Sequence, residues 1–178
     1  MSKNVLVLSS SPRKNANSDI LCDEFIKGAS EIGHSIEKIL LKDKKINYCT
    51  GCVVCTTGKA CPQKDDMAEL IEKMVTADVI VLATPVYFYS MCAQLKTMID
   101  RTCAGYQRIR NKEFYFIATA AVDRKNMLER TFEGLRGFID CLDGSEEKGT
   151  VYGVSVWNTG EIRNTDAMKE AFELGKNI

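Results

Sequence analysis

The sequence predicts an α/β protein with a doubly wound, five-stranded parallel sheet in the order 2-1-3-4-5 and helices on both faces. Two observations support this fold class. Short apolar runs rich in Val, Ile and Leu alternate with segments whose apolar residues recur at helical spacing. No repeat, low-complexity tract or linker interrupts the alternation, so residues 1–178 are expected to form a single domain. Such alternation favours a parallel sheet, because right-handed crossovers place a helix over the sheet after each strand.

The five predicted strands are apolar runs of strand length. The first is β-branched and Leu-rich and is bounded by Pro12, which suits a strand buried on both faces. The second alternates as an outer strand does, and the third is the most continuous apolar run, which places it at the centre of the sheet. In chain order the predicted strands are residues 5–10, 35–41, 78–85, 113–121 and 149–157.

A predicted helix follows each strand. Asn17 or Ser18 is the expected N-cap of the first helix and Gly33 its stop, while Asp65 or Asp66 is expected to cap the second. The helical spacing covers residues 20–32, 67–75, 95–99, 127–142 and 166–176.

Composition narrows the class of protein. The sequence has 24 Lys plus Arg residues and 24 Asp plus Glu residues. It therefore has no excess of positive charge that would favour binding to nucleic acid. The apolar run at the N-terminus has no cleavage site after it, and no stretch of about 18 apolar residues predicts a membrane span. We therefore expect a cytoplasmic protein, whose eight cysteines are thiols, metal ligands or redox groups rather than a disulfide framework.

The loop after the first strand, "SSSPRKNANS" (residues 9–18), combines hydroxyls, a guanidinium and a helix N-terminus. In a doubly wound sheet of this order, ligands bind beyond the carboxyl ends of the first and third strands. The loop suits a phosphate, and because it lacks the glycines of a dinucleotide motif, a monophosphate ester fits better. The alternative is that Ser, Pro and Asn are ordinary turn residues.

The loop after the third strand, "VYFYS" (residues 86–90), carries three aromatic residues over the same edge of the sheet. Aromatic and small polar residues at this point suit a flat ring system. Exposed aromatic clusters also mark interfaces, so we expect a homodimer or higher homo-oligomer as well.

Four cysteines lie within "CTGCVVCTTGKAC", at Cys49, Cys52, Cys55 and Cys61. The spacing C-x2-C-x2-C-x5-C allows the thiolates to converge on a [4Fe-4S] cluster. Zinc is a second interpretation, although structural zinc sites usually bring two cysteine pairs from opposed loops. A thiol loop without metal is the third.

Three stretches together carry a family resemblance: "SPRKNANS", "ATPVYFYSMCAQLKTMIDR" and "CTGCVVCTTGKACPQKDDM". Over roughly residues 4–105 the chain resembles the NADPH-dependent FMN reductase family of flavodoxin-like proteins, particularly its iron-sulfur flavoprotein branch. It departs from the family pattern at Ser10, where relatives usually have glycine, and in residues 119–126, which replace a glycine-rich loop.

The resemblance implies FMN as cofactor, with its phosphate held after the first strand and its ring bordered by residues after the third and fourth. The implied cofactor-binding residues are Ser9, Ser11, Arg13, Asn17, Ser18, Pro85, Val86, Tyr87, Phe88, Ser90, Ala120 and Ala121.

A cofactor must carry the chemistry, because the single histidine, His34, falls at a turn and allows no Ser-His-Asp or Cys-His set. The expected function is an oxidoreductase that takes a hydride from NAD(P)H and reduces flavins, quinones or similar small acceptors, with no catalytic side chain. One alternative is an iron-sulfur flavoprotein that carries electrons between proteins, and another is a flavin-binding module without turnover.

The remaining cysteines are expected to be mainly small apolar residues. Cys22, Cys103 and Cys141 fall in helical segments, where packing is the simplest role. Cys92 falls near a helix N-terminus beside the aromatic loop, so redox activity is an alternative to packing there.

Overall fold

The computed structural model describes residues 2–178 and contains the predicted parallel sheet, in the order β2-β1-β3-β5-β6. Its strands are β1 (Asn4–Ser9), β2 (Ser35–Leu40), β3 (Val79–Tyr87), β5 (Glu113–Thr119) and β6 (Glu146–Gly153). The two-residue strand β4 (Ser90–Met91), which the sequence did not predict, pairs antiparallel with the end of β3. Counted without β4, the strand order is the predicted 2-1-3-4-5.

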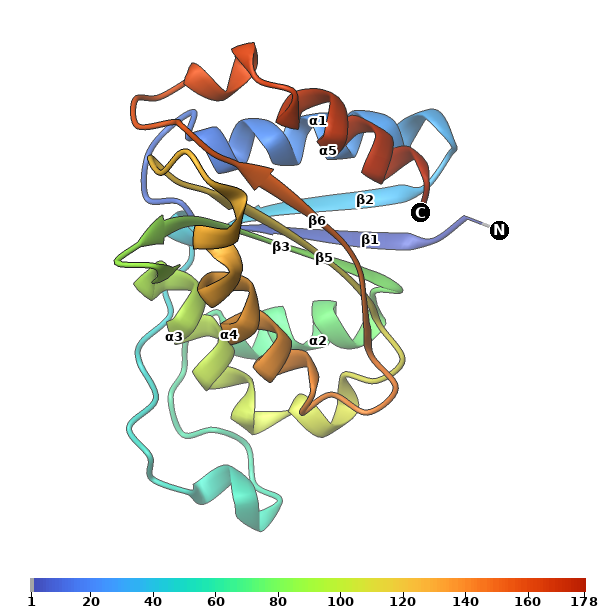
Figure 1. The fold of residues 1–178 in the computed structure, drawn as a ribbon. Coiled ribbons are helices and arrows are strands. Elements are labelled where there is room, and N and C mark those ends of the chain that lie inside the picture. The colour runs from blue at the N-terminus through green and yellow to red at the C-terminus, as the bar shows by residue number, and fades with distance from the viewer. Residues whose placement is uncertain (1) are drawn as a thin grey trace.

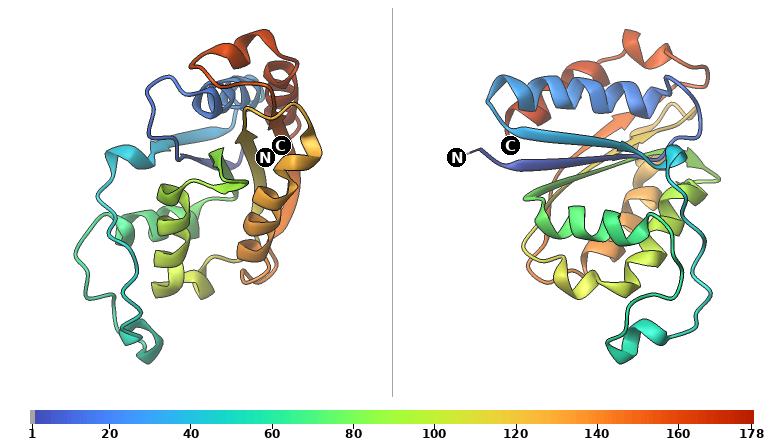
Figure 2. Two further views of the ribbon diagram at one scale, coloured as in Figure 1. Left: turned by 60° about the vertical axis from the view of Figure 1, so that its left-hand side comes forward. Right: turned by 180° about the vertical axis from the view of Figure 1, so that it is seen from behind.

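Helices cover both faces of the sheet, as Figures 1 and 2 show: α1 and α5 lie on one face, and α2, α3 and α4 on the other. Within residues 2–178, no helix has the length and apolar composition of a membrane span. The helices are α1 (Asn17–Glu31), α2 (Met67–Thr76), α3 (Ala93–Arg101), α4 (Glu129–Ile139) and α5 (Ala167–Lys176).

The alternation of side chains along the strands divides the core into two layers. Val5 and Val7 of β1 pack with α1 and α5, whereas Leu6 and Leu8 pack with the helices of the other face. β3 is buried on both faces in the same way, because it lies between β1 and β5. This position explains why its sequence reads as one continuous apolar run.

Two predicted boundaries differ from the structure. The N-cap of α1 is Ala16, so Asn17 and Ser18 lie in the first turn; Gly33 follows the helix with a φ of 83°, as a stop residue should. The fifth strand, predicted to reach residue 157, ends at Gly153. There the chain turns toward β5, and the Val156 N–H donates to the Ala120 carbonyl at 3.0 Å.

The packing of α1 against α5 requires two glycines. A Cβ on Gly28 would lie 2.1 Å from the Phe172 carbonyl oxygen, and one on Gly175 would lie 2.0 Å from the Phe25 carbonyl oxygen. Because both obstacles are backbone atoms, they cannot rotate away. The two helices therefore approach each other more closely than any side chain at these positions would allow.

We expect Gly175→Ala to lower the free energy of unfolding by about 1 to 3 kcal/mol, since the added methyl forces the helices apart. Gly137→Ala is the matched control, because a Cβ at that helical glycine meets nothing within 4 Å. It should leave stability unchanged or raise it by up to about 1 kcal/mol through helix propensity. Urea denaturation measures both, and equal effects would contradict this account of the helix contact.

Candidate functional site

A pocket of about 130 Å³ opens beyond the carboxyl ends of the strands, at the edge to which the arrowheads in Figure 1 point. It lies where the winding of the sheet reverses, between the loops after β1 and β3. Loops after β5 and β6 complete its wall. The lining residues are Ser11, Arg13, Ala16, Asn17, Ser18, Pro85, Val86, Tyr87, Thr119, Ala120, Ala121, Val156 and Trp157.

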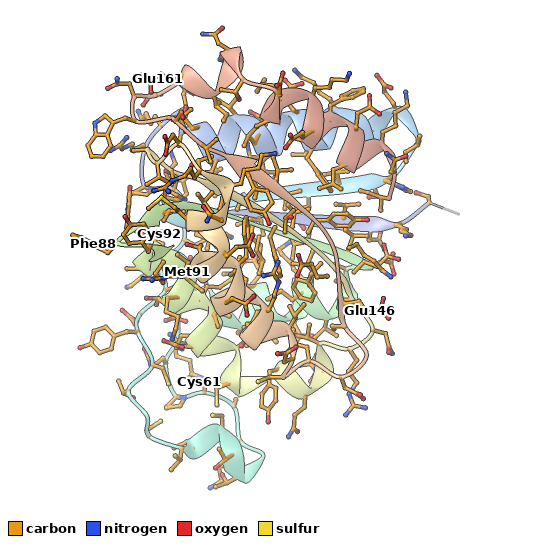
Figure 3. All side chains as sticks on the ribbon, in the orientation of Figure 1. Cys61, Phe88, Met91, Cys92, Glu146 and Glu161 are labelled. Atoms are coloured by element: carbon orange, nitrogen blue, oxygen red, sulfur yellow. The ribbon has the colours of Figure 1, made fainter. Side chains whose placement is uncertain are left out.

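Most of the predicted cofactor-binding residues line this pocket, and three do not: Ser9, Phe88 and Ser90. Ser9 is buried in the sheet, where it pairs with Leu40 on one side and Ala83 on the other. Phe88 is fully exposed with a φ of 51°, and Figure 3 shows it projecting away from the body of the molecule. Its position suits an interface as well as a ligand, and the homo-oligomer stays a prediction.

One end of the pocket is formed by the N-terminus of α1. The N-cap of α1, Ala16, makes no side-chain hydrogen bond to the first-turn N–H groups. Ser18 is 0% exposed, and within residues 2–178 its Oγ has no hydrogen-bond partner. The one acidic residue of this turn, Asp19, is paired with Lys38 at 2.7 Å. Backbone N–H groups, the helix dipole and an unpartnered hydroxyl therefore converge where a phosphate would be stabilised.

Arg13 and Asn17, both expected at the phosphate, make hydrogen bonds to the loop after β6. The Arg13 guanidinium donates to the Trp157 carbonyl at 2.8 Å. The Asn17 amide nitrogen donates to the Asn158 carbonyl at 2.9 Å, and its oxygen accepts from the Gly160 N–H at 2.9 Å. Both residues still line the pocket. The contacts place residues 157–160 over the opening.

The sequence analysis missed Trp157, the only tryptophan of the chain. It lines the pocket and is 68% exposed. Glu161 fixes this turn by accepting from the N–H groups of Trp157 at 2.7 Å and Asn158 at 2.9 Å. These bonds and one from the Asn158 side chain lower the pKa of Glu161. An aromatic residue after the fifth strand, at the edge where the other loops meet, was the signal that could have found it.

A buried network joins the loops after β1 and β3. The Ser10 hydroxyl donates to the Ala83 carbonyl at 2.6 Å, and the Cys92 thiol donates to the Ser10 carbonyl at 3.3 Å. The Cys92 N–H donates to the Thr84 hydroxyl at 3.0 Å. Cys92 is 0% exposed, as a residue that packs in the core should be. Ser10 supplies a hydroxyl to this network at a position where a glycine could not.

The cysteine loop lies at the other end of α3. It runs from β2 to α2 along the side of the molecule, far from the hairpin of β3 and β4, as the teal segment of Figure 1 shows. α3 begins after Cys92 and ends at Arg101, a length of about 13 Å. The length of α3 therefore separates the cysteine loop from the start of this helix beside the β3–β4 hairpin.

A fifth thiol joins the four cysteines of the loop. Cys103 Sγ lies 3.9 Å from Cys55 Sγ. Its pKa is raised by the hydrogen bond with Cys55, by burial, and by the nearby Cys55, Cys49 and Cys61. Thiolates are suitable ligands for an iron-sulfur cluster, but within residues 2–178 no three His, Cys, Asp or Glu side chains converge as metal ligands.

The packing role expected of the helical cysteines holds for one of the three. Cys22 is fully buried, which raises its pKa above the usual range. Cys103 and Cys141 are exposed, so packing was the wrong prediction for them. Cys103 lies in a 3₁₀ turn after α3, and Cys141 lies beyond the end of α4, where the burial pattern of the helix no longer applies.

Residues 3–140 match the family model for NADPH-dependent FMN reductases. The chain belongs to this family. As a family member it is an oxidoreductase. It is 34% identical to an iron-sulfur flavoprotein of Methanocaldococcus jannaschii over 98% of this chain and 94% of that one. It is also 44% identical to an iron-sulfur flavoprotein of Archaeoglobus fulgidus, over 51% of this chain and 41% of the relative.

The fold of this family member also matches solved structures. An NAD(P)H:quinone oxidoreductase from Methanothermobacter marburgensis superposes with a TM-score of 0.80. The match covers 99% of this chain and 97% of the other at 18% identity. At that identity the likeness establishes the shared fold.

A buried ion pair fixes the stems of the cysteine loop in this reductase family member. The Arg101 guanidinium binds both carboxylate oxygens of Asp65, at 2.6 and 2.9 Å, and the two side chains are 2% and 0% exposed. Arg101 also donates to the Asn47 carbonyl at 2.7 Å, and Asp65 accepts from the Asn47 N–H at 3.0 Å. The pair thereby joins the entry and exit of the loop to the end of α3.

The ion pair makes stability depend on pH. The hydrogen bonds from Arg101 lower the pKa of Asp65 from its ordinary 3.8 to about 2. Stabilisation is therefore complete above about pH 4 and is lost as the pH falls toward about 2, a change of about 1 to 2 kcal/mol after solvent screening.

We expect Asp65→Asn to lower the free energy of unfolding by about 3 kcal/mol at neutral pH, because it leaves the Arg101 cation buried without a counterion. The variant should also lose the pH dependence between about pH 4 and about pH 2. Urea titrations across this range measure both effects. Glu72→Gln, which breaks the exposed pair with Arg108, is the control and should change nothing measurable. An unaltered acid transition in Asp65→Asn would contradict the assignment.

Proposed function

We propose that this family member binds FMN in the pocket beyond β1, β3 and β5, and that it uses NAD(P)H to reduce flavins, quinones or similar small acceptors. When bound, FMN would supply the redox chemistry, since a flavin accepts a hydride from a nicotinamide and passes its electrons on. The observation that carries the proposal is the unpartnered, buried Ser18 hydroxyl at the uncapped N-terminus of α1. A phosphate monoester there satisfies groups that the chain leaves unpaired.

At the phosphate end, the chain's own groups act as donors. The Ser18 hydroxyl and the first-turn N–H groups would donate to phosphate oxygens. Ser11 Oγ already accepts from the Arg13 N–H at 3.3 Å, which orients its hydroxyl in the loop. Arg13 adds positive charge at the rim while its guanidinium remains bonded to the Trp157 carbonyl. The site recognises the charge of the ligand mainly through backbone and hydroxyl groups.

At the ring end, the lining is apolar and aromatic, with Pro85, Val86 and Tyr87 on one side and Ala121 and Trp157 on the other. Such walls bind a flat ring and exclude water from the reacting atoms. The Ala120 backbone is already satisfied, because its N–H donates to the Gly153 carbonyl at 2.8 Å. Ala120 therefore contributes its methyl group and not a hydrogen bond.

The described lining of the pocket contains one side chain, Tyr87, of a type that can act as a general acid. Among the lining residues that the structure describes, Arg13 is the only charged one, and neither a carboxylate nor a histidine is present. His34 lies at the opposite edge, where its Nδ1 accepts from the Lys3 N–H at 3.1 Å. The residues of this chain thus bind and orient the reactants, which agrees with chemistry carried by a cofactor.

We expect Ser18→Ala to weaken FMN binding about 10- to 100-fold, the usual effect of losing a hydrogen bond to a charged group. Trp157 lines the pocket, so FMN should quench its fluorescence and report the affinity directly. Thr131→Val is the matched control, since Thr131 Oγ1 is also buried without a partner but lies in α4 outside the pocket. Equal affinities for both variants would place the phosphate elsewhere.

A second function, electron transfer between proteins as an iron-sulfur flavoprotein, is favoured by the C-x2-C-x2-C-x5-C spacing of the cysteine loop. Its cluster ligands would be Cys49, Cys52, Cys55 and Cys61. The names of the two relatives given above agree with it.

Anaerobically purified protein distinguishes the two functions. Flavin absorbance after FMN addition, together with steady oxidation of NADPH or NADH in the presence of a quinone, is the expected result for the reductase. About four irons and four acid-labile sulfides per chain, with slow quinone reduction, would instead favour the electron carrier. Protein that binds no flavin at saturating FMN would contradict both functions.

A further inference from the structure

Cys55 of the cysteine loop forms a close thiol pair with Cys103, a residue that neither the flavin site nor the cluster hypothesis uses. Cys55 lies in the 3₁₀ turn Val54–Thr57 of the loop, and Cys103 lies in the 3₁₀ turn Thr102–Ala104 directly after α3. Their sulfur atoms are 3.9 Å apart although the residues are 48 positions apart in the chain. A shift of about 2 Å would bring the sulfurs to the disulfide bond length of about 2.05 Å.

The surroundings disfavour three of the other thiols as partners. Cys61 is held by the Arg101 guanidinium, whose Nη2 lies 3.7 Å from its sulfur. Cys22 and Cys92 are 0% exposed and lie in the core, out of reach of an oxidant. Cys103 is exposed and Cys55 is partly exposed, so a small oxidant can reach both.

The loop can make the required movement without disturbing its stems. Two residues with left-handed backbone flank the turn of Cys55: Val53, with a φ of 51°, and Gly58, with a φ of 79°. Left-handed backbone is unfavourable for a β-branched residue such as Val53, so the turn is not held in a deep local minimum. The ion pair of Asp65 and Arg101 holds the two ends of the loop independently of this turn. Arg101 lies two residues before Cys103.

We propose that Cys55 and Cys103 form a reversible disulfide that fastens the cysteine loop to the end of α3. The oxidant would be a low-molecular-weight disulfide. Cys55 and Cys103 each lose a proton, and the Cys55–Cys103 bond forms as the S–S bond of the oxidant breaks. Two electrons and two protons thereby convert the oxidant into two thiols.

The disulfide would withdraw Cys55 from the set Cys49, Cys52, Cys55 and Cys61. Oxidation of the chain and assembly of a four-thiolate cluster are then mutually exclusive, and Cys103 acts as the partner that competes for Cys55. The inference concerns these thiols only and does not depend on flavin binding.

The test uses the full chain, prepared reduced and metal-free and then treated with oxidised glutathione. The expected result is a Cys55–Cys103 peptide in a non-reducing mass-spectrometric map, the loss of two reactive thiols per chain, and full reversal by dithiothreitol. Cys103→Ser should abolish that peptide. Cys141→Ser, which removes another exposed cysteine near a helix end, should retain it.

Three results would overturn the proposal: disulfides confined to the loop cysteines, stable glutathione adducts on Cys55 without an intramolecular bond, or no loss of thiols. Because the map of the unsubstituted chain decides among these results, the test does not depend on the folding of either variant.

Discussion

The pairing of β1 with β3 is the constraint on which the site depends. The two strands run parallel in register from Val5 with Val79 to Ser9 with Ala83. The Ser10 N–H continues the ladder by donating to the Ala83 carbonyl at 3.0 Å. β1 ends opposite Ala83, and β3 continues to Tyr87, so the loop that enters α1 and the end of β3 lie at the same edge of the sheet. Without this register, the anion-binding helix end and the aromatic wall would not share one pocket.

The pocket and the cysteine loop are held in place by different parts of the structure. The pocket rests on the sheet edge and on the Ser10 and Cys92 network, which is buried and hydrogen-bonded throughout. The cysteine loop rests on the single ion pair of Asp65 and Arg101 at the far end of α3. A buried ion pair contributes little net stability but specifies one arrangement, because either charge is costly when its partner is lost. The loop can therefore change its chemical state while the pocket keeps its geometry.

Local sequence patterns were sufficient to predict the five parallel strands and the five helices, and the family resemblance implied most of the residues that line the pocket. The five apolar runs predicted the sheet, because strands that are buried on both faces are made almost entirely of apolar residues. The residues that pattern analysis missed or misplaced depend on contacts between distant segments. Asn17 bonds to a loop more than 140 positions later, and the pairing of Cys103 with Cys55 follows from where α3 ends. Such contacts leave no periodic signal, and neither did the outward turn at Phe88.

The close contact of α1 with α5 also bears on how the protein is made. The first and last helices cover the same face of the sheet, so this half of the core unites the two ends of the chain. During synthesis, the apolar side of α1, including Ile20, Leu21 and Phe25, has no α5 to pack against until residues 167–176 have left the ribosome. Completion of this half of the core therefore requires the docking of the ten-residue helix α5. Until then the nascent chain carries an uncovered apolar surface on which a chaperone could act.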